Sequence, residues 1–378
     1  MENRDTGELL KALQPVALSA GISLQQLHRA TSALQLDPHV LELVKDQPEH
    51  VRTVGEYVGI LVSDKRIAAG RRMLETQRGL LGAITQTYGI PEHILLAIWG
   101  IESNFGERMG HFSVLRSLAT LIAKEDRRQS FWCEQFVAAL KISDRLNIPP
   151  ERITGSWAGA MGHTQFIPTT YLDFAVDFDG DGKADIWLSV ADGLASAANY
   201  LQKSGWRRGQ IWGLEIALPD DFDFNRFADG EPRPQSAWRM LNINPLDAVW
   251  PANHDDAAYE LRLPSGAFGP AFLVTANFNT ILTYNASISY ALAVAHLADR
   301  ISGKGMISTP WPNENPLHLE ERLELQQCLV SLGYDTGGID GMLGRASRTA
   351  IRHYQLAHSM IADGYPSQTL LEHIRRTC

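Results

Sequence analysis

The stretch ILLAIWGIESNFG, from Ile94 to Gly106, decides how the first half of this chain folds. Its apolar residues occupy nearly every side of a helix, and a helix that is apolar all round is buried in a protein core. Pro91 stands where proline favours the start of such a helix, and the polar and small residues after Glu102 indicate its end. The stretch therefore predicts a buried helix with a carboxylate, Glu102, at its C-terminal end.

Two effects act on the charge of this carboxylate. Apolar walls disfavour the ionised form of a carboxyl group, and the negative end of the helix dipole does the same. We therefore expect a raised pKa, which would allow Glu102 to act as a general acid near neutral pH. The alternative is a solvated or ion-paired glutamate, since perturbed groups are functional only in some proteins.

The composition of the whole chain limits the classes of protein to consider. Of its 378 residues, 44% are hydrophobic and 20% are charged, which is typical of a globular protein with one large domain or more than one. The net charge is −9 and the basic residues are dispersed, which argues against a nucleic-acid-binding protein. We find no apolar run as long as a membrane span, and no signal peptide is visible at the N-terminus.

Composition and periodicity divide the chain into three zones. Residues 1–301 are mostly helical, with an irregular part from about Gly213 to Asn279 where Pro and Gly interrupt short runs typical of strands. Residues 302–316 are rich in Gly, Pro, Ser and Asn, as linkers are. Residues 317–378 predict three helices in a unit near the lower size limit for an independent core. The expected fold is mainly α (α+β), in two domains joined by this linker.

Three cysteines, Cys133, Cys328 and Cys378, cannot all pair within one chain. Cys133 lies in a helical pattern and is expected to be a small core residue. Cys328 and Cys378 both lie in the C-terminal zone, where a disulfide would stabilise a small domain in an oxidising compartment. The sequence leaves open whether this disulfide forms.

A second informative segment is DFDGDGKADIW, which begins at Asp177. Its acidic residues alternate with the spacing of an EF-hand calcium loop, and a glycine at position 6 allows the sharp turn. The expected ligands at positions 1, 3, 5 and 7 are Asp177, Asp179, Asp181 and the backbone carbonyl of Lys183. Carboxylates this close repel one another unless a cation neutralises them, so we expect a structural calcium ion and no organic cofactor.

The end of this loop departs from the EF-hand pattern. Position 12, which normally supplies a bidentate glutamate, is Leu188. Asp192 would supply the closing carboxylate if the loop is longer than standard, and Asp185 is a weaker candidate. The alternative is an acidic turn that binds no metal ion.

A third segment, GSWAGAMGHTQFIPTTY, starts at Gly155 and lies between the other two. Its glycines would allow the backbone to approach a ligand closely. Ser156 and Gln165 can donate or accept hydrogen bonds there. The alternative is a tightly packed turn that binds nothing.

The chain resembles the lytic murein transglycosylase B family in five segments that occur in order: AIWGIESNFG, GSWAGAMGHTQFIPTTY, DFDGDGKADIW, ASAANYLQKSGW and NFNTILTYNASISYALAV. The resemblance covers residues 7–301 and implies a lysozyme-like helical catalytic domain with an EF-hand-like calcium loop. The tail, with GGIDGMLGRASRTAIRHYQ, resembles a small three-helix peptidoglycan-binding domain. The domains are thus expected at residues 1–301 and 317–378, with the linker at 302–316.

The resemblance also implies a reaction that does not use water. Members of the family cleave the β-1,4 bond between N-acetylmuramic acid and N-acetylglucosamine in peptidoglycan and leave a 1,6-anhydro end. They use one carboxylate where conventional glycosidases use two, and Glu102 matches it. As an acid it would protonate the leaving O4 while the substrate's 2-acetamido oxygen assists. As a base it would then take the proton of the O6 hydroxyl.

Other residues are carried over from the family by motif. Those that match residues of the saccharide groove are Ser156, Gln165, Tyr57, Tyr200, Tyr284, Asn285 and Tyr290. Arg127 and Arg128 match a basic pair that would meet the carboxylates of stem peptides. The plainer alternatives are tyrosines that belong to the core and arginines that are merely solvated.

The partners implied by the resemblance are the glycan strands and stem peptides of peptidoglycan, and we expect a monomer. The family is usually exported, often as a lipoprotein, so the implied location is the periplasm of a Gram-negative envelope, although this sequence shows neither signal nor lipobox. Two alternatives stay open. One is a muramidase that uses water and a second carboxylate, and the other is a scaffold that binds peptidoglycan without cutting it.

Overall fold

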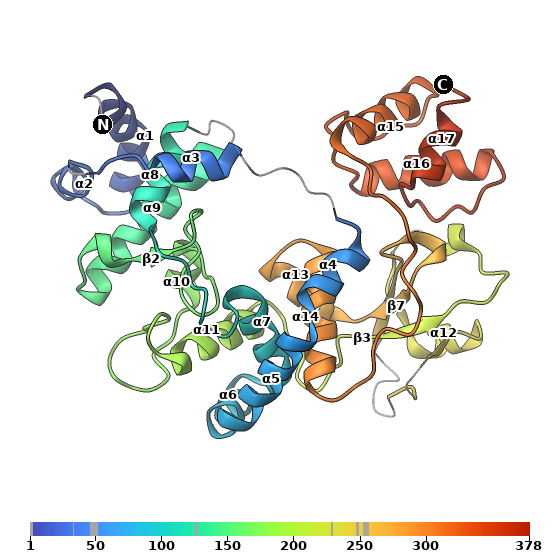
Figure 1. The fold of residues 1–378 in the computed structure, drawn as a ribbon, viewed down its shortest axis with the longest axis horizontal. Coiled ribbons are helices and arrows are strands. Elements are labelled where there is room, and N and C mark those ends of the chain that lie inside the picture. The colour runs from blue at the N-terminus through green and yellow to red at the C-terminus, as the bar shows by residue number, and fades with distance from the viewer. Residues whose placement is uncertain are drawn as a thin grey trace. The chain divides into compact units, whose positions relative to one another are not determined.

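The structure, a computed structural model, describes residues 3–32, 34–45, 52–124, 128–227, 230–246, 249–251 and 257–378. The chain forms two compact units that alternate along the sequence (Figure 1). The first unit contains residues 1–48 and 68–203, and the second contains residues 49–67 and 204–378. The fold is mainly helical with a small sheet region, as the sequence predicted.

The first unit is helical. Its helices are α1 (Asn3–Ser19), α2 (Leu24–Thr31), α3 (Pro38–Lys45), α6 (Arg78–Tyr88), α7 (Glu92–Ser103), α8 (Val114–Lys124), α9 (Gln129–Leu146), α10 (Pro168–Phe174) and α11 (Val190–Lys203). Helix α9 packs on α8, α10 and α1, and α11 packs on α6 and α7. Helix α5 (Asp64–Thr76) spans the boundary between the two units. Cys133 is a buried residue of α9, as predicted.

Helix α7 is the buried helix that the sequence predicts. All its residues from Ile94 to Gly100 are buried. Pro91 is the N-cap rather than the first helical residue, because its ψ of 141° is still extended. The helix ends at Ser103, and Asn104 follows in the left-handed conformation with φ of 51°, a common C-terminal cap.

The second unit contains a five-stranded antiparallel sheet of order β4-β6-β7-β3-β5. The strands are β3 (Gly213–Ala217), β4 (Arg233–Pro234), β5 (Asn244–Pro245), β6 (Ala258–Arg262) and β7 (Ala271–Val274). Leu273 lies in register with Leu214 on one side and Leu261 on the other. The short helix α12 (Gln235–Met240) contributes the fully buried Trp238 to the core of this part. The short strands expected between Gly213 and Asn279 are therefore present.

Three further helices of the second unit are α4 (Val54–Leu61), α13 (Ala276–Tyr284) and α14 (Ile288–Ile301). Helix α14 packs against both α4 and α13. In the described part of the chain, no single helix has the length and apolarity of a membrane span. Helices α13 and α14 have this length and apolarity only when they are taken together, and the chain bends by 114° between them.

The tail folds into the three helices that the sequence predicts, α15 (Leu319–Ser331), α16 (Arg345–Ala357) and α17 (Gln368–Ile374) (Figure 1). They share a core of apolar residues that includes Leu329, Ile351 and Leu371. Cys328 and Cys378 are both free thiols in the structure. Burial, and after it the neighbouring Cys378 thiol, raises the pKa of Cys328 to about 12. The two cysteines whose pairing the sequence left open are therefore neighbours, but no disulfide joins them.

The segment predicted to be a linker forms no helix or strand, yet it is held against other parts of the second unit. The backbone N–H groups of Ser308 and Thr309 donate to the Glu215 carboxylate at 2.7 and 2.8 Å. The Trp311 side chain packs so closely on Gly55 that a Cβ there would lie 2.6 Å from the ring. The connection between the sheet and the tail is therefore anchored at several points.

Candidate active site

Glu102 is the penultimate residue of α7, and its side chain is partly buried. The following residue, Ser103, connects the end of α7 to the segment of residues 155–166, which we call the site loop. The Ser103 hydroxyl donates to the His163 carbonyl at 2.6 Å and accepts from the Gly106 N–H at 3.0 Å. The structure therefore places the helix end that carries Glu102 directly against the loop that carries Ser156 and Gln165.

The ring of His163 strengthens this junction. The Trp99 indole N–H donates to Nδ1 of His163 at 3.1 Å, and the two rings meet edge to face with centroids 5.5 Å apart. Burial lowers the pKa of His163, and the charge of Asp185 opposes this only in part. A neutral imidazole suits the contact, since Nδ1 must be unprotonated to accept a hydrogen bond. The sequence gives no signal for His163, because a single histidine in a glycine-rich segment shows no partner.

Two glycines of the site loop lie in close contact with backbone carbonyl groups of the protein itself. A Cβ at Gly162 would lie 2.4 Å from the Ile186 carbonyl oxygen, and one at Gly155 would lie 2.2 Å from that of Ala160. Neither distance is compatible with any side chain without movement of the backbone. The structure thus favours the packed turn over close approach of these glycines to a ligand.

The two polar residues predicted in the site loop make hydrogen bonds to backbone groups in it and next to it. The Ser156 hydroxyl accepts from the Ala160 N–H at 3.0 Å. The Gln165 side-chain NH₂ donates to the Gly162 carbonyl at 2.9 Å and to the Met109 carbonyl at 3.1 Å. Both side chains therefore help to fix the shape of the loop next to α7.

Three non-glycine residues around this junction have left-handed backbones. Asn104 and Phe105 follow α7 with φ of 51° and 60°, and Gln165 has φ of 52°. Such conformations cost on the order of 1–3 kcal/mol each and persist where surrounding contacts impose them, often at functional sites. Here Phe105 is buried and packs edge to face on Trp99 at 5.6 Å. Periodicity gave no signal for this strain.

Tyr200 joins the same part of the first unit. It lies on α11 and packs edge to face on Phe174 with ring centroids 4.9 Å apart. Phe166, which ends the site loop, lies 6.0 Å from the Tyr200 ring. Of the predicted groove residues, Ser156, Gln165 and Tyr200 thus share a unit with Glu102.

The other predicted groove residues belong to the second unit. Tyr57 comes from α4 and is partly buried, while Tyr284 and the exposed Asn285 form the end of α13. Tyr290 lies on α14 and is only 2% exposed, which favours a core role for it. Because α14 packs on α4 and α13, these four residues come from neighbouring helices.

The two predicted arginines have different outcomes. Arg127 lies outside the described residues. Arg128 is exposed just before α9, and its guanidinium lies over the rings of Phe131 and Trp132, at 5.0 and 5.8 Å from their centroids. The structure therefore gives Arg128 a surface cation–π contact.

The acidic loop, residues 177–192, brings three carboxylates together. Single oxygen atoms of Asp177, Asp179 and Asp192 all lie within 4.8 Å of one another. Asp192 is fully buried on α11, and burial raises its pKa although backbone N–H groups of Phe178 and Asp185 donate to it. Convergent hard oxygens of this kind fit a divalent cation such as calcium.

Three other positions of the acidic loop do not join this group. The carboxylate of Asp181 lies outside the cluster and accepts from the Lys183 N–H at 2.8 Å. Leu188, at position 12, is 86% exposed. Asp185 is occupied as an acceptor for the Trp187 and Leu188 N–H groups. The closing carboxylate is therefore placed at Asp192, four residues beyond the standard position.

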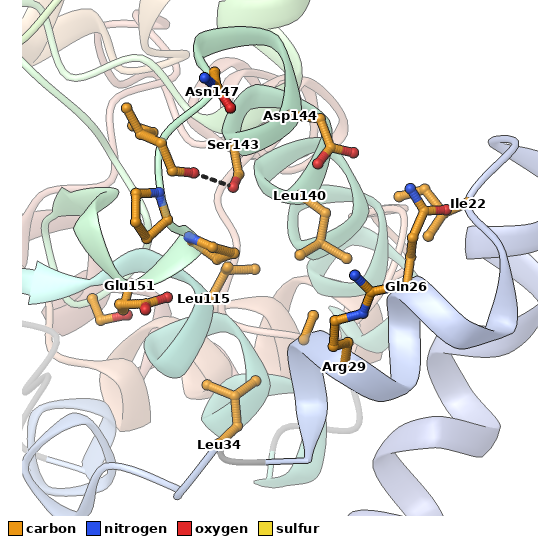
Figure 2. Close-up of a pocket in the computed structure, with 15 residues that line it drawn as sticks. Ile22, Gln26, Arg29, Leu34, Leu115, Leu140, Ser143, Asp144, Asn147 and Glu151 are labelled. Atoms are coloured by element: carbon orange, nitrogen blue, oxygen red, sulfur yellow. Dashed lines mark hydrogen bonds between the residues drawn. The ribbon is translucent and has the colours of Figure 1, made fainter.

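A separate cavity of about 880 Å³ lies in the first unit (Figure 2). Arg29 and Gln26 of α2 lie on one side of it, and Leu140 and Asp144 of α9 lie on the other. Within the described chain, its lining includes none of the site residues predicted from the sequence. The cavity is therefore distinct from the junction of α7 and the site loop.

Comparison with known proteins matches both parts of the chain to families. Residues 5–299 match the family described as "Transglycosylase SLT domain", and residues 318–374 match the "Putative peptidoglycan binding domain". Membrane-bound lytic murein transglycosylase B of Escherichia coli (strain K12) is 33% identical over 226 residues. That alignment spans 57% of this chain and 58% of the E. coli protein.

Solved structures extend the likeness to nearly the whole chain. The crystal structure of SltB3 from Pseudomonas aeruginosa in complex with NAG-anhNAM-pentapeptide is 44% identical, with a TM-score of 0.91 over 98% of this chain and 99% of that one. The Escherichia coli lytic transglycosylase Slt35 in complex with calcium is 27% identical, with a TM-score of 0.64 over 78% of this chain and 92% of that one.

Proposed function

The chain belongs to the transglycosylase SLT domain family, and we propose that it is a lytic transglycosylase acting on peptidoglycan. The observation that carries the proposal is the whole-chain likeness to SltB3, a protein crystallised with a fragment that has an anhydromuramyl end. The bond cleaved is the β-1,4 bond between N-acetylmuramic acid and N-acetylglucosamine. The product is a 1,6-anhydromuramyl end, formed without water.

In the proposed mechanism, Glu102 acts first as an acid and then as a base. It protonates the leaving O4 while the glycosidic bond breaks, and the 2-acetamido oxygen of the substrate stabilises the anomeric carbon. It then takes the proton from the O6 hydroxyl as O6 bonds to C1. Its place at the end of the buried α7, with the site loop bonded to the next residue, supports this role because a general acid–base must be held in position.

The saccharide-binding residues of the proposal are those carried over by motif. Gln165 is the best supported in the first unit, because its NH₂ donates to the Gly162 and Met109 carbonyls, and no described residue donates to its amide oxygen, which can accept from a substrate N–H. Tyr57, Tyr284 and Asn285 offer a flat face or a polar tip suited to sugars. Arg127 and Arg128 are proposed to bind the carboxylates of stem peptides.

We propose that calcium occupies the acidic loop as a structural ion. Its ligands would include Asp177, Asp179 and Asp192, with Asp181 and the Lys183 carbonyl as further candidates from the spacing. The fit rests on three convergent carboxylates, one of which is fully buried. The cation would supply charge neutralisation that lets this loop pack beside α11.

We propose residues 1–301 as the catalytic domain and 317–378 as a domain that binds peptidoglycan, which the tail's family match supports. The E. coli relative is described as membrane-bound and SltB1 of Pseudomonas aeruginosa as soluble. The proposed location is the periplasm, where the wall substrate lies, and the protein is proposed to act as a monomer.

The test is mass spectrometry of soluble fragments released from purified sacculi. Wild type is expected to release anhydromuropeptides. Glu102→Gln, which keeps the shape of the side chain but cannot exchange a proton, is expected to lower the rate by about 10² to 10⁴. Glu92→Gln, at the opposite end of α7, is the matched control and is expected to keep wild-type activity.

Other results of this experiment would contradict the proposal. Fragments with ordinary reducing ends would make the protein a muramidase, and a second carboxylate would then be required. Sacculus binding without any release of fragments by wild type would make it a scaffold. Equal activity of wild type and Glu102→Gln would remove Glu102 from the mechanism.

A further inference from the structure

The second unit contains a cavity of about 810 Å³ between residues near the sheet and the tail, which we call the α16 cavity. This volume falls within the usual range for ligand sites. The sheet side includes apolar and acidic residues, among them Phe227, Leu263, Glu231 and Glu260. The tail side is dominated by arginines of α16.

Three arginines of α16 line this cavity, Arg345, Arg348 and Arg352. Their spacing of three and four residues puts them on one face of the helix, where neighbouring like charges destabilise it. Burial lowers the pKa of Arg352, and the charges of Arg348 and Arg345 lower it further. These guanidinium groups therefore repel one another on one side of the cavity, and the charge of Asp363 opposes this only in part.

Protein carboxylates offset only part of the charge on this face: Asp363 opposes the lowering of the pKa of Arg348 and Arg352. Among the described residues, none forms an ion pair with any of the three arginines. The nearby Asp363 accepts from the Gln355 side chain at 2.9 Å and from the Ala267 N–H at 2.9 Å. Glu260, across the cavity, is paired with Arg262 at 2.8 Å. Among the described residues, this face of α16 therefore has no direct carboxylate partner.

The two sides of the cavity are held together by direct contacts. The Asp363 bond to Ala267 connects the tail to the segment after β6. Gly266, in that segment, lies so close to Asp363 that a Cβ there would be 2.6 Å from its carboxylate. The Tyr365 hydroxyl donates to Glu314 in the linker. A ligand would therefore meet a preformed site, which lowers the cost of binding.

We propose that the α16 cavity binds the free carboxylates of a peptidoglycan stem peptide. This inference deepens the proposed function and rests on it. A neutral glycan would not need three arginines. Glu231 on the facing side adds negative charge, which disfavours a compact dianion such as phosphate more than a single carboxylate. Arginine also matches carboxylates in a bidentate geometry. The cavity thus favours a ligand that presents carboxylates.

The test is isothermal titration of the full chain with a synthetic stem pentapeptide and with the same peptide after amidation of its carboxylates. Wild type is expected to bind the free acid at least about tenfold more tightly than the amide, since each charged hydrogen bond lost costs more than a neutral one. Arg345→Gln and Arg348→Gln are expected to weaken binding of the free acid by about tenfold each.

Matched variants separate a charge effect from a structural one. Arg376→Gln removes an exposed arginine of the tail outside the cavity and is expected to bind as wild type does. Arg348→Lys is expected to recover part of the binding that Arg348→Gln loses. Arg345 is exposed, so Arg345→Gln carries the test if Arg348→Gln fails to fold.

Three results would overturn the inference: equal affinity for the free acid and the amide, unchanged affinity in both glutamine variants, or displacement of the peptide by an equal concentration of inorganic phosphate. The outcome is independent of catalysis, because Glu102→Gln is expected to bind the peptide normally. Loss of peptide binding with normal release of anhydromuropeptides would refute the cavity alone. Peptide binding without release by wild type would refute the lytic function alone.

Discussion

The site loop and the acidic loop both depend on glycine, but for different physical reasons. In the site loop, Gly162 leaves no room for a Cβ, which would lie 2.4 Å from the Ile186 carbonyl oxygen. In the acidic loop, Gly180 has open space around it and only its φ of 80° favours glycine. The first loop is packed against its own protein, whereas a Cβ at Gly180 in the second would meet no neighbouring atom. The difference teaches that glycines in similar sequences can be required for packing in one place and for backbone conformation in another.

The largest expected effect compares one substitution in each loop. Gly162→Ala adds a Cβ in contact with backbone at a φ of 70° and is expected to cost about 3 kcal/mol or more of unfolding free energy. Gly180→Ala is expected to lower the unfolding free energy by only about 1 kcal/mol, the cost of placing a Cβ on a left-handed backbone. Urea unfolding of both variants measures the difference, and equal losses would show that packing does not distinguish the loops.

The second prediction adds a cation. Calcium at 100 times its dissociation constant is expected to raise the unfolding free energy by about 2.7 kcal/mol. Thermal unfolding with calcium and with a chelator measures this. Asp179→Asn and Asp192→Asn are expected to abolish the gain, while Asp181→Asn, outside the cluster, should keep most of it. A loss with Asp181→Asn as large as with Asp192→Asn would favour the standard loop instead.

The third prediction uses pH to weaken the junction of the site loop. The pKa of His163 is lowered in the folded state, so the unfolded chain takes up the proton first. Stability is therefore complete above the ordinary value of about 6.5 and is lost as pH falls from there towards the folded pKa. His163→Gln should flatten this slope in melting experiments between pH 7 and 5.

A background slope is expected in both proteins over the same range, from about pH 6.5 downwards. Burial lowers the pKa of His296, in the second unit, to about 4. The difference between wild type and His163→Gln removes this contribution, because His296 is present in both. If the two proteins lost stability in parallel from pH 7 to 5, the neutral His163–Trp99 contact would not be the cause.

The smallest expected effect concerns position 12 of the acidic loop. Leu188→Glu restores the residue of a standard EF-hand, but the side chain is 86% exposed and Asp192 already completes the cluster. Calcium affinity should therefore change by no more than about twofold, as for other surface substitutions. Titration calorimetry measures it, and a gain of tenfold or more would mean that Leu188 faces the cation.

Short-range patterns in the sequence predicted much of the molecule correctly. The apolar run around Trp99 predicted a buried helix, and α7 begins and ends within one residue of the expected positions. Periodicity also predicted the three helices of the tail and the short strands after Gly213. These features depend on neighbours a few residues apart, which the sequence displays directly.

The site was predicted less completely. Spacing identified Asp177 and Asp179 and offered Asp192 as one of two closing carboxylates. It could not show that His163 holds the site loop to Trp99, because the two residues are 64 positions apart. The role of the glycines was also open, since the atoms that crowd them come from other segments.

The sequence by itself determined where the chain is helical, which helix is buried, and that Glu102 stands at its end. Only the tertiary structure decided that Asp192 joins the acidic cluster, that Ser103 and His163 connect α7 to the site loop, and that α16 turns its arginines towards a cavity. The physical reason is the separation along the chain of the residues that interact. Helix formation and burial follow from periodic local contacts, whereas each of these sites needs side chains that only the folded path of the chain brings within hydrogen-bonding or Coulombic distance.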